Sequence, residues 1–175
     1  LTSNEIFDLE RFPERLLIVG GGYIATEFAS IFSGLGASVV QSYRGELFLR
    51  GFDHDIRRFL AEEMRKAGVD LRFNHHVTAL ESQSGGVLAH LSDGNEPFDA
   101  ALYATGRRPN IARLGLEHTR VTLTEAGYIK VDDAFQTAEP SIFALGDMTG
   151  GWELTPVAIG EAMAFAQTQF GGQAQ

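Results

Sequence analysis

The chain has 175 residues and a mass of 19.1 kDa, with 44% hydrophobic and 21% charged residues, the ordinary composition of a globular protein with one or two domains. It contains no cysteine, which excludes a disulfide, a thiolate metal site and a cysteine nucleophile within the chain. The net charge of −9 argues against non-specific binding of nucleic acid or of an anionic membrane surface. No apolar run is as long as a membrane span and no leader pattern opens the chain, so we expect a soluble cytoplasmic protein.

The first part of the chain alternates predicted strands and helices. A short apolar run at 16–19, bounded by glycine, is typical of a strand buried on both faces. After a helix comes a second strand at 38–43, then a helix from the N-cap Asp53 to Ala67, then a third strand at 69–73. This order is typical of a doubly wound parallel α/β fold of the Rossmann type. The apolar residues that recur at helical spacing in the first helix are Ile24, Phe28, Ile31, Phe32 and Leu35, and those that mark the inner face of the second are Ile56, Leu60 and Met64.

The pattern changes to short strands from Val77 onward. Segments at 77–81, at 87–91 and around Phe98 are separated by glycine-containing hairpin turns. They predict an antiparallel meander packed on the parallel sheet. A further buried strand at 100–104 completes this part of the chain.

A boundary divides the chain into two predicted domains, 1–109 and 110–175. The second is rich in loops, with a strand expected at 142–145, a helix from about 156 to 170 and a frayed end at 171–175.

A glycine-rich turn, Gly20-Gly21-Gly22-x-x-Ala25, lies between the first predicted strand and the first predicted helix. Gly20 permits the tight turn, Gly22 lets the backbone approach a pyrophosphate, and Ala25 lets the helix and strand pack closely. The helix N terminus adds unpaired N–H groups and the positive end of its dipole. A plain strand–helix turn is the alternative, but the surrounding pattern favours a dinucleotide site.

The end of the second strand indicates which dinucleotide this is. Sites for NAD usually carry an acid there to hold the ribose 2′-hydroxyl, whereas this chain has Tyr43 followed by Arg44, with Arg50 six residues later. Two guanidinium groups suit the 2′-phosphate of NADPH, with a joint preference of roughly 2–4 kcal/mol after desolvation and screening. The alternative is that both are solvated surface arginines.

These segments, in this order, resemble the flavoprotein disulfide reductases, and within them the glutathione reductase branch. The Arg44 and Arg50 segment favours the glutathione and trypanothione branches over lipoamide dehydrogenases, whose NADH-using members have an acid at the position of Tyr43. The segments that carry the resemblance are Gly20–Glu27, Tyr43–Glu46, Leu49–Asp53, Ala104–Asn110, Ala144–Asp147 and Leu154–Ala158.

The resemblance implies individual roles in NADPH binding. Tyr23 would cover the nicotinamide pocket, Glu27 would lie near the nicotinamide, and Gly106 with Arg107 would close over the other side of the nucleotide. A buried aromatic and a solvated helix glutamate are the plain alternatives for Tyr23 and Glu27. The complete set expected for this nucleotide is Gly20, Gly21, Gly22, Tyr23, Ile24, Glu27, Arg44, Arg50, Thr105, Gly106 and Arg107.

The second predicted domain would complete an FAD-binding domain. By resemblance, Asp147 binds a ribitol hydroxyl of FAD, and Leu154 with Thr155 opens a helix that faces the flavin ring. From the residues alone, Asp147 could be a turn aspartate and Thr155 a plain helix cap. His75 and His76 are not expected to bind a metal, because adjacent strand residues point to opposite faces.

The implied reaction of the whole protein passes a hydride from NADPH through FAD to a disulfide, glutathione disulfide. The redox cysteine pair and the His–Glu acid–base pair of the family are absent, so no catalytic residue is expected here. The resemblance therefore implies a fragment that binds NADPH, holds only part of an FAD site, and belongs with the missing FAD and interface domains of a homodimer.

Two alternatives remain open at this stage. One is a stand-alone module that binds or senses NADPH, and the other is a fragment of a trypanothione, mercuric or lipoamide type of reductase. In a fragment of any of these reductases, residues 110–175 would expose apolar surface, and we expect self-association or weak packing there.

Overall fold

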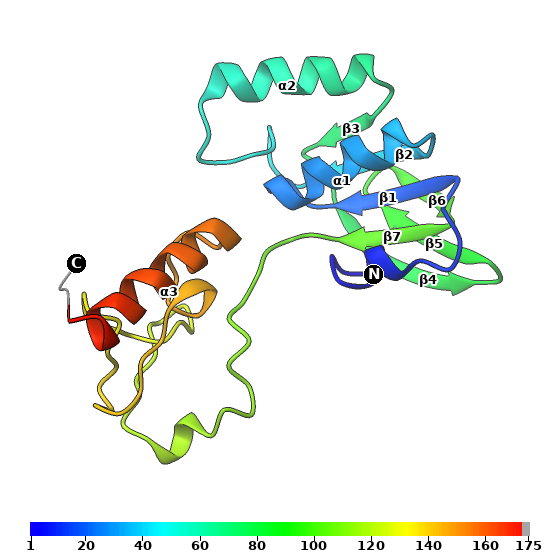
Figure 1. The fold of residues 1–175 in the computed structure, drawn as a ribbon. Coiled ribbons are helices and arrows are strands. Elements are labelled where there is room, and N and C mark those ends of the chain that lie inside the picture. Colours follow the sequence, from blue (N-terminus) through cyan, green and yellow to red (C-terminus); the bar gives the residue numbers. More distant parts are fainter. Residues whose placement is uncertain (173–175) are drawn as a thin grey trace. The chain divides into compact units, whose positions relative to one another are not determined.

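The computed structural model describes residues 1–172, and the chain forms two compact units, Leu1–Gly106 and Arg107–Gln175 (Figure 1). Within the described residues, no helix is long and apolar enough to cross a membrane.

A four-stranded parallel sheet forms the centre of the first unit. Its strands are β1 (Arg15–Val19), β2 (Ser38–Tyr43), β3 (Asp70–Phe73) and β7 (Ala100–Tyr103), in the spatial order β3-β2-β1-β7. Since β2 and β3 lie on one side of β1 and β7 on the other, the strand order reverses between β1 and β7. Ligands of open α/β sheets bind at the carboxyl ends of the strands at such a point.

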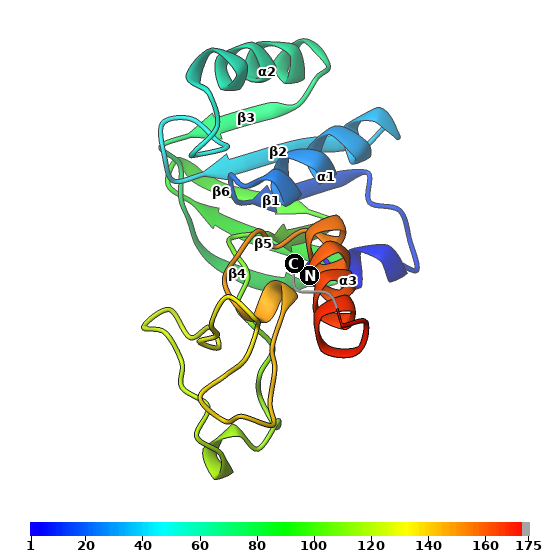
Figure 2. The ribbon, with the colours of Figure 1, turned by 60° about the vertical axis from the view of Figure 1, so that its left-hand side comes forward.

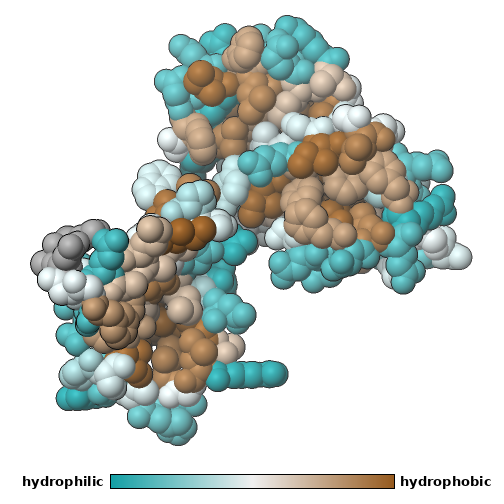
Figure 3. Space-filling model, in the orientation of Figure 1, coloured by the Kyte–Doolittle hydropathy of each residue, from teal (hydrophilic) through white to brown (hydrophobic). Residues whose placement is uncertain are grey.

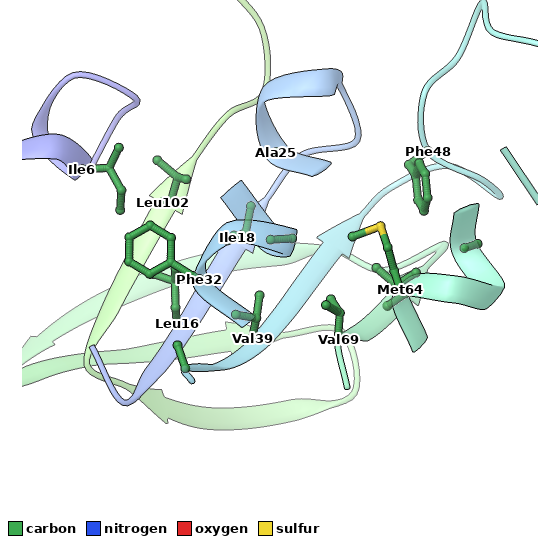
Figure 4. Close-up of a cluster of buried hydrophobic side chains, with 14 of the residues drawn as sticks. Ile6, Leu16, Ile18, Ala25, Phe32, Val39, Phe48, Met64, Val69 and Leu102 are labelled. Atoms are coloured by element: carbon green, nitrogen blue, oxygen red, sulfur yellow. The ribbon is translucent and has the colours of Figure 1, made fainter. Parts of the chain in front are cut away.

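Two helices cover one face of this sheet, α1 (Tyr23–Gly34) and α2 (His54–Lys66) (Figure 2). The helices, the sheet and the short η1 (Glu5–Asp8) share one apolar core, drawn in Figure 4. The core residues labelled there are Ile6, Leu16, Ile18, Ala25, Phe32, Val39, Phe48, Met64, Val69 and Leu102.

The faces predicted for the two helices were partly wrong. In α1 the buried residues include Ala25, Ala29 and Phe32, whereas Ile31 and Leu35 are exposed. In α2 the buried residues are Ala61 and Met64, and Ile56 is 59% exposed. Both helices carry apolar residues beyond a single stripe, so periodicity alone did not fix the buried face, and alanines occupy part of the contact with the sheet.

An antiparallel meander covers the other face of the parallel sheet, as predicted. It consists of β4 (Val77–Gln83), β5 (Gly86–Leu91) and β6 (Gly94–Phe98), in that order. A second buried cluster joins the two sheets, formed by Leu17, Val40, Ala89, Leu91, Phe98 and Ala101. The predicted α/β class with a parallel sheet and a meander is thus confirmed.

The second unit is mostly irregular, with the short helices η2 (Leu116–His118) and η3 (Gly146–Met148) and the longer α3 (Thr155–Phe170). The strand predicted at 142–145 is absent. Among residues 1–172 this segment makes one isolated bridge, between Gln136 and Phe143, and a strand requires a continuous hydrogen-bonded partner. Of the frayed end predicted at 171–175, the last three residues lie outside the described part.

No residue of α3 is buried, and its apolar side chains at Ile159, Met163 and Phe170 are exposed. Figure 3 shows hydrophobic surface over α3 and over α1.

Candidate nucleotide-binding site

The glycine turn lies at the carboxyl end of β1, beside the carboxyl end of β7. Gly20 has φ +143°, and a Cβ there would lie 2.3 Å from the carbonyl oxygen of Ala104, just beyond β7. Its N–H donates to the carbonyl of Ser42 (2.9 Å), and its own carbonyl accepts from the side chain of Gln41 (3.1 Å). Only glycine fits both this backbone conformation and this close approach.

Gly21 is packed as tightly, but against a side chain. A Cβ on Gly21 would lie 2.4 Å from the ring of Tyr43, and a Cβ on Gly45 would lie 2.7 Å from the same ring. The carbonyl of Gly21 accepts from the N–H of Leu49 (2.6 Å). Tyr43 and Leu49 therefore join the glycine turn to the segment that follows β2.

Gly22 differs from its two neighbours. It is the N-cap of α1 with φ −86° and ψ 177°, a backbone conformation open to any residue, and a Cβ there would meet nothing within 4 Å. No side chain in the described part of the chain caps this helix N terminus. The folded chain itself therefore does not require glycine here, and the open space lies where uncapped amides and a positive dipole end attract an anion.

Arg44 and Arg50 lie in an exposed segment that is firmly anchored. The guanidinium of Arg57, in α2, donates to the carbonyls of Leu47 (2.6 Å) and Phe48 (2.7 Å). Phe48 itself lies in this segment, and its side chain is fully buried. The side chains of Arg44 and Arg50 are exposed and make no hydrogen bond or ion pair among the described residues, so both remain available for an anion.

The remaining predicted contacts of the first unit are exposed or partly exposed. Tyr23 and Glu27 are four residues apart on α1, hence on one face, and both are exposed, while Ile24 is half-buried. Thr105 and Gly106 are exposed beyond the end of β7.

Two residues that were assigned to different cofactors lie together in the second unit. Arg107 donates to the carboxylate of Asp147 (3.3 Å) and pairs with Glu153 (3.4 Å). Glu153 also accepts from the hydroxyl of Tyr128 (2.8 Å), and this bond to a carboxylate raises the pKa of the Tyr128 phenol. A ligand of Asp147 would have to share that carboxylate with Arg107.

The turn that carries Asp147 packs against α3. The N–H of Gly146 donates to the carboxylate of Glu161 (2.6 Å), and a Cβ on Gly146 would lie 3.2 Å from the Cβ of Ala158. Leu154 is the N-cap of α3 and Thr155 its first residue, both exposed and without a side-chain cap. This helix N terminus is thus also open to an acceptor.

Sequence reasoning gave no role near the site to Gln41 or to the pair Asn74 and His75. Gln41 is fully buried, and its Oε1 has no hydrogen-bond partner among the described residues. A polar residue within the apolar strand β2 was the available signal. Asn74 and His75 follow β3, and their contacts with residues near Arg44 depend on strand order, which the local sequence does not reveal.

Comparisons with known proteins identify the family of the chain. Residues 1–162 match the family described as pyridine nucleotide-disulphide oxidoreductase. The chain is 50% identical to a glutathione reductase of Burkholderia cepacia, over 99% of this chain and 39% of that protein. It is 45% identical to a glutathione reductase of Nostoc sp. (98% and 40%) and 41% identical to a trypanothione reductase of Leishmania donovani (99% and 36%).

Solved structures give the same result. The HOCl-induced flavoprotein disulfide reductase RclA from Escherichia coli matches with a TM-score of 0.92 at 32% identity, over 100% of this chain and 40% of that one. The chain thus spans about two fifths of the length of these relatives. From the family match and these identities, the chain belongs to the pyridine nucleotide-disulphide oxidoreductases.

Proposed function

We propose that this chain is the NADPH-binding part, with a segment of the FAD-binding domain, of a reductase that resembles glutathione reductase. The first unit binds NADPH, and the second supplies one side of the flavin site. When bound, the two cofactors supply the hydride-transfer chemistry of the family. The chain has no cysteine, so the exchange with glutathione disulfide is carried out by parts of the protein outside this sequence.

The open space at Gly22 is the observation that carries the proposal. Gly20 and Gly21 are required by close packing within the protein, whereas Gly22 is not. A glycine that the fold does not need, at an uncapped helix N terminus and at the switch point of the sheet, fits a backbone that approaches a pyrophosphate.

The preference for NADPH over NADH rests on the segment after β2. The end of β2 carries no acid, and the exposed guanidinium groups of Arg44 and Arg50 have no partner among the described residues. The segment is fixed to α2 and to the glycine turn, and this anchoring supports the proposal that both arginines lie near the adenosine ribose. Arginine side chains bind phosphate with paired, charge-assisted bonds.

The residues of the second unit fit a partial flavin site. The α3 N terminus at Leu154 and Thr155 is uncapped and would place backbone N–H groups beside an acceptor on the flavin. The Asp147 carboxylate would accept a hydrogen bond from a hydroxyl of the cofactor while it keeps its bond to Arg107.

Thr105, Gly106 and Arg107 remain proposed contacts of the NADPH nucleotide.

Calorimetric titration with 2′-phospho-AMP and with AMP tests the NADPH assignment. The pair of ligands isolates the 2′-phosphate, and we expect at least a tenfold preference for it, which corresponds to about 1.4 kcal/mol. The double variant Arg44→Ala/Arg50→Ala should remove this preference. Arg11→Ala is the matched control, because Arg11 is also exposed but precedes the amino end of β1.

The outcomes separate the two parts of the proposal. Equal affinity for the two ligands would refute the NADPH preference and leave a dinucleotide site. No binding of AMP, of 2′-phospho-AMP or of NADPH by the folded chain would refute the dinucleotide site itself.

Glutathione disulfide is proposed over trypanothione disulfide on the higher identity to proteins named glutathione reductase. Activity of the complete protein with each disulfide tests this choice. A higher kcat/KM with trypanothione disulfide would overturn it.

A further inference from the structure

Arg44 is held on both sides by backbone hydrogen bonds from one short segment. The N–H of His75 donates to the carbonyl of Tyr43 (3.0 Å), and the N–H of Asn74 donates to the carbonyl of Gly45 (2.9 Å). The two residues that flank Arg44 are thus fixed by two consecutive residues at the end of β3, which we name the Asn74–His75 clamp. Asn74 adopts a left-handed conformation (φ +51°), which asparagine tolerates better than most residues.

The side chain of His75 ties this clamp to two further elements. Its Nδ1 lies 2.8 Å from the hydroxyl of Ser42, at the end of β2, and its Nε2 lies 2.8 Å from the carboxylate of Asp93, in the turn between β5 and β6. His75 is 7% exposed. Arg72, on β3, faces the same carboxylate at 3.7 Å. A buried imidazole therefore links the end of β2, the end of β3 and the meander.

The side-chain contacts that run from Ser42 through His75 to Asp93 follow the order of a nucleophilic triad, but the burial of Ser42 excludes that role. Ser42 is 1% exposed and lies on the face of β2 that packs on the meander. Its hydroxyl also lies 3.3 Å from the carbonyl of His75. No substrate reaches this hydroxyl, so the three residues act on the chain itself.

These contacts bear directly on the proposed site. The backbone carbonyl of Ser42 accepts from the N–H of Gly20, and the ring of Tyr43 packs on Gly21. A group that fixes Ser42 and Tyr43 thereby fixes the position of Arg44 relative to the glycine turn. A long arginine on an unfixed backbone would lose more conformational entropy when it binds a phosphate.

We propose that His75 is a positioning residue for Arg44: the Asn74–His75 clamp, oriented by Ser42 and Asp93, holds Arg44 where it binds the 2′-phosphate. The inference rests on the proposed function, because it assigns that ligand group to Arg44. It adds a determinant of nucleotide specificity that does not contact the nucleotide.

The experiment is a double-mutant cycle between His75 and Arg44, read as the ratio of affinities for 2′-phospho-AMP and AMP. In the 175-residue chain, His75→Ala should lower this ratio by about three- to tenfold, within the range of coupling between residues that share partners. In the Arg44→Ala background the same substitution should leave the ratio unchanged. A role in stability alone would lower affinity for both ligands and leave the ratio intact in either background.

Three further variants sharpen the cycle. Compared with His75→Ala, the His75→Asn variant should recover much of the affinity ratio, because the introduced amide can bond the hydroxyl of Ser42 as the Nδ1 of His75 does. Asp93→Asn, a substitution at a side chain that is 55% exposed, should lower the ratio by a smaller factor, and it tests the proposal even where His75→Ala does not fold. His76→Ala is the matched control, since the side chain of His76 is exposed and makes no hydrogen bond or ion pair among the described residues.

Two results would overturn the inference while the proposed function stands. The first is an unchanged ratio in folded His75→Ala and Asp93→Asn. The second is an equal fall of the ratio in the Arg44→Ala background. If the unmodified chain shows no preference for 2′-phospho-AMP, the NADPH assignment fails, and the inference fails with it.

Discussion

Replacing Gly20 and Gly22 separately by alanine should separate folding from nucleotide binding. The two glycines lie two residues apart in one turn, but their surroundings differ. The Gly20→Ala methyl would lie 2.3 Å from the backbone carbonyl of Ala104, at a φ of +143° that alanine rarely adopts. We expect backbone strain and overpacking to cost about 2–5 kcal/mol of unfolding free energy.

Gly22→Ala should leave the fold intact. Its backbone conformation suits alanine, and the new methyl would meet no atom within 4 Å. We expect an unfolding free energy within about 1 kcal/mol of the unmodified chain. The methyl would instead occupy space beside the proposed pyrophosphate. Loss of one charge-assisted hydrogen bond, about 1.5–3 kcal/mol, would weaken NADPH binding by at least about tenfold.

Urea unfolding and calorimetry on the same preparations provide the two readouts. A ligand without a pyrophosphate, 2′-phosphoadenosine, is the control, and Gly22→Ala should bind it as the unmodified chain does. If Gly22→Ala is folded and binds NADPH with unchanged affinity, the pyrophosphate does not lie at this turn and our interpretation of the open space is wrong.

Three other predictions concern stability and association. Asp53 accepts from the N–H groups of the first turn of α2, so Asp53→Ala should lower the unfolding free energy by about 1 kcal/mol in urea titrations, and no loss would contradict its role as a cap. The hydrogen bond from Arg72 lowers the pKa of Glu96 in the folded chain. The contribution of this bond to the unfolding free energy is therefore complete above the ordinary glutamate pKa of about 4.3, and it is lost as the pH falls through the lower pKa of the folded chain. Glu96→Gln should therefore make the unfolding free energy depend less on pH at the acid end of a urea titration series. The exposed apolar face of α3 should cause self-association in sedimentation experiments, which Ile159→Asn with Met163→Gln should reduce, whereas a monomer at all concentrations would contradict this expectation.

The local sequence was sufficient for the elements of the first unit and for the glycine turn. The apolar run of β1, the cap Asp53 and the glycine turns of the meander each act over a few residues, so they could be recognised without knowledge of the rest of the fold. Periodicity was less reliable where a helix is apolar on more than one face. Ile31 and Ile56 matched the expected stripe and are exposed, because small residues allow the helix to approach the sheet on another side.

The strand expected at 142–145 shows the other limit. Its apolar residues suited a strand, but strand formation requires a neighbouring strand, and the described chain offers only the bridge to Gln136. The site had a similar limit: the sequence placed Arg107 and Asp147 in different binding sites, whereas the folded second unit bonds them to each other.

The sequence by itself determined the α/β order, the glycine-rich turn and the two arginines after β2, because these signals are local in the chain. Only the tertiary structure decided which glycine the fold requires and which one it leaves open, and that His75 lies against Ser42, 33 residues earlier in the chain. Those contacts follow from the order β3-β2-β1-β7, which brings the ends of distant strands to one edge of the sheet. Strand order depends on how apolar faces are buried over the whole unit, and no short segment specifies it.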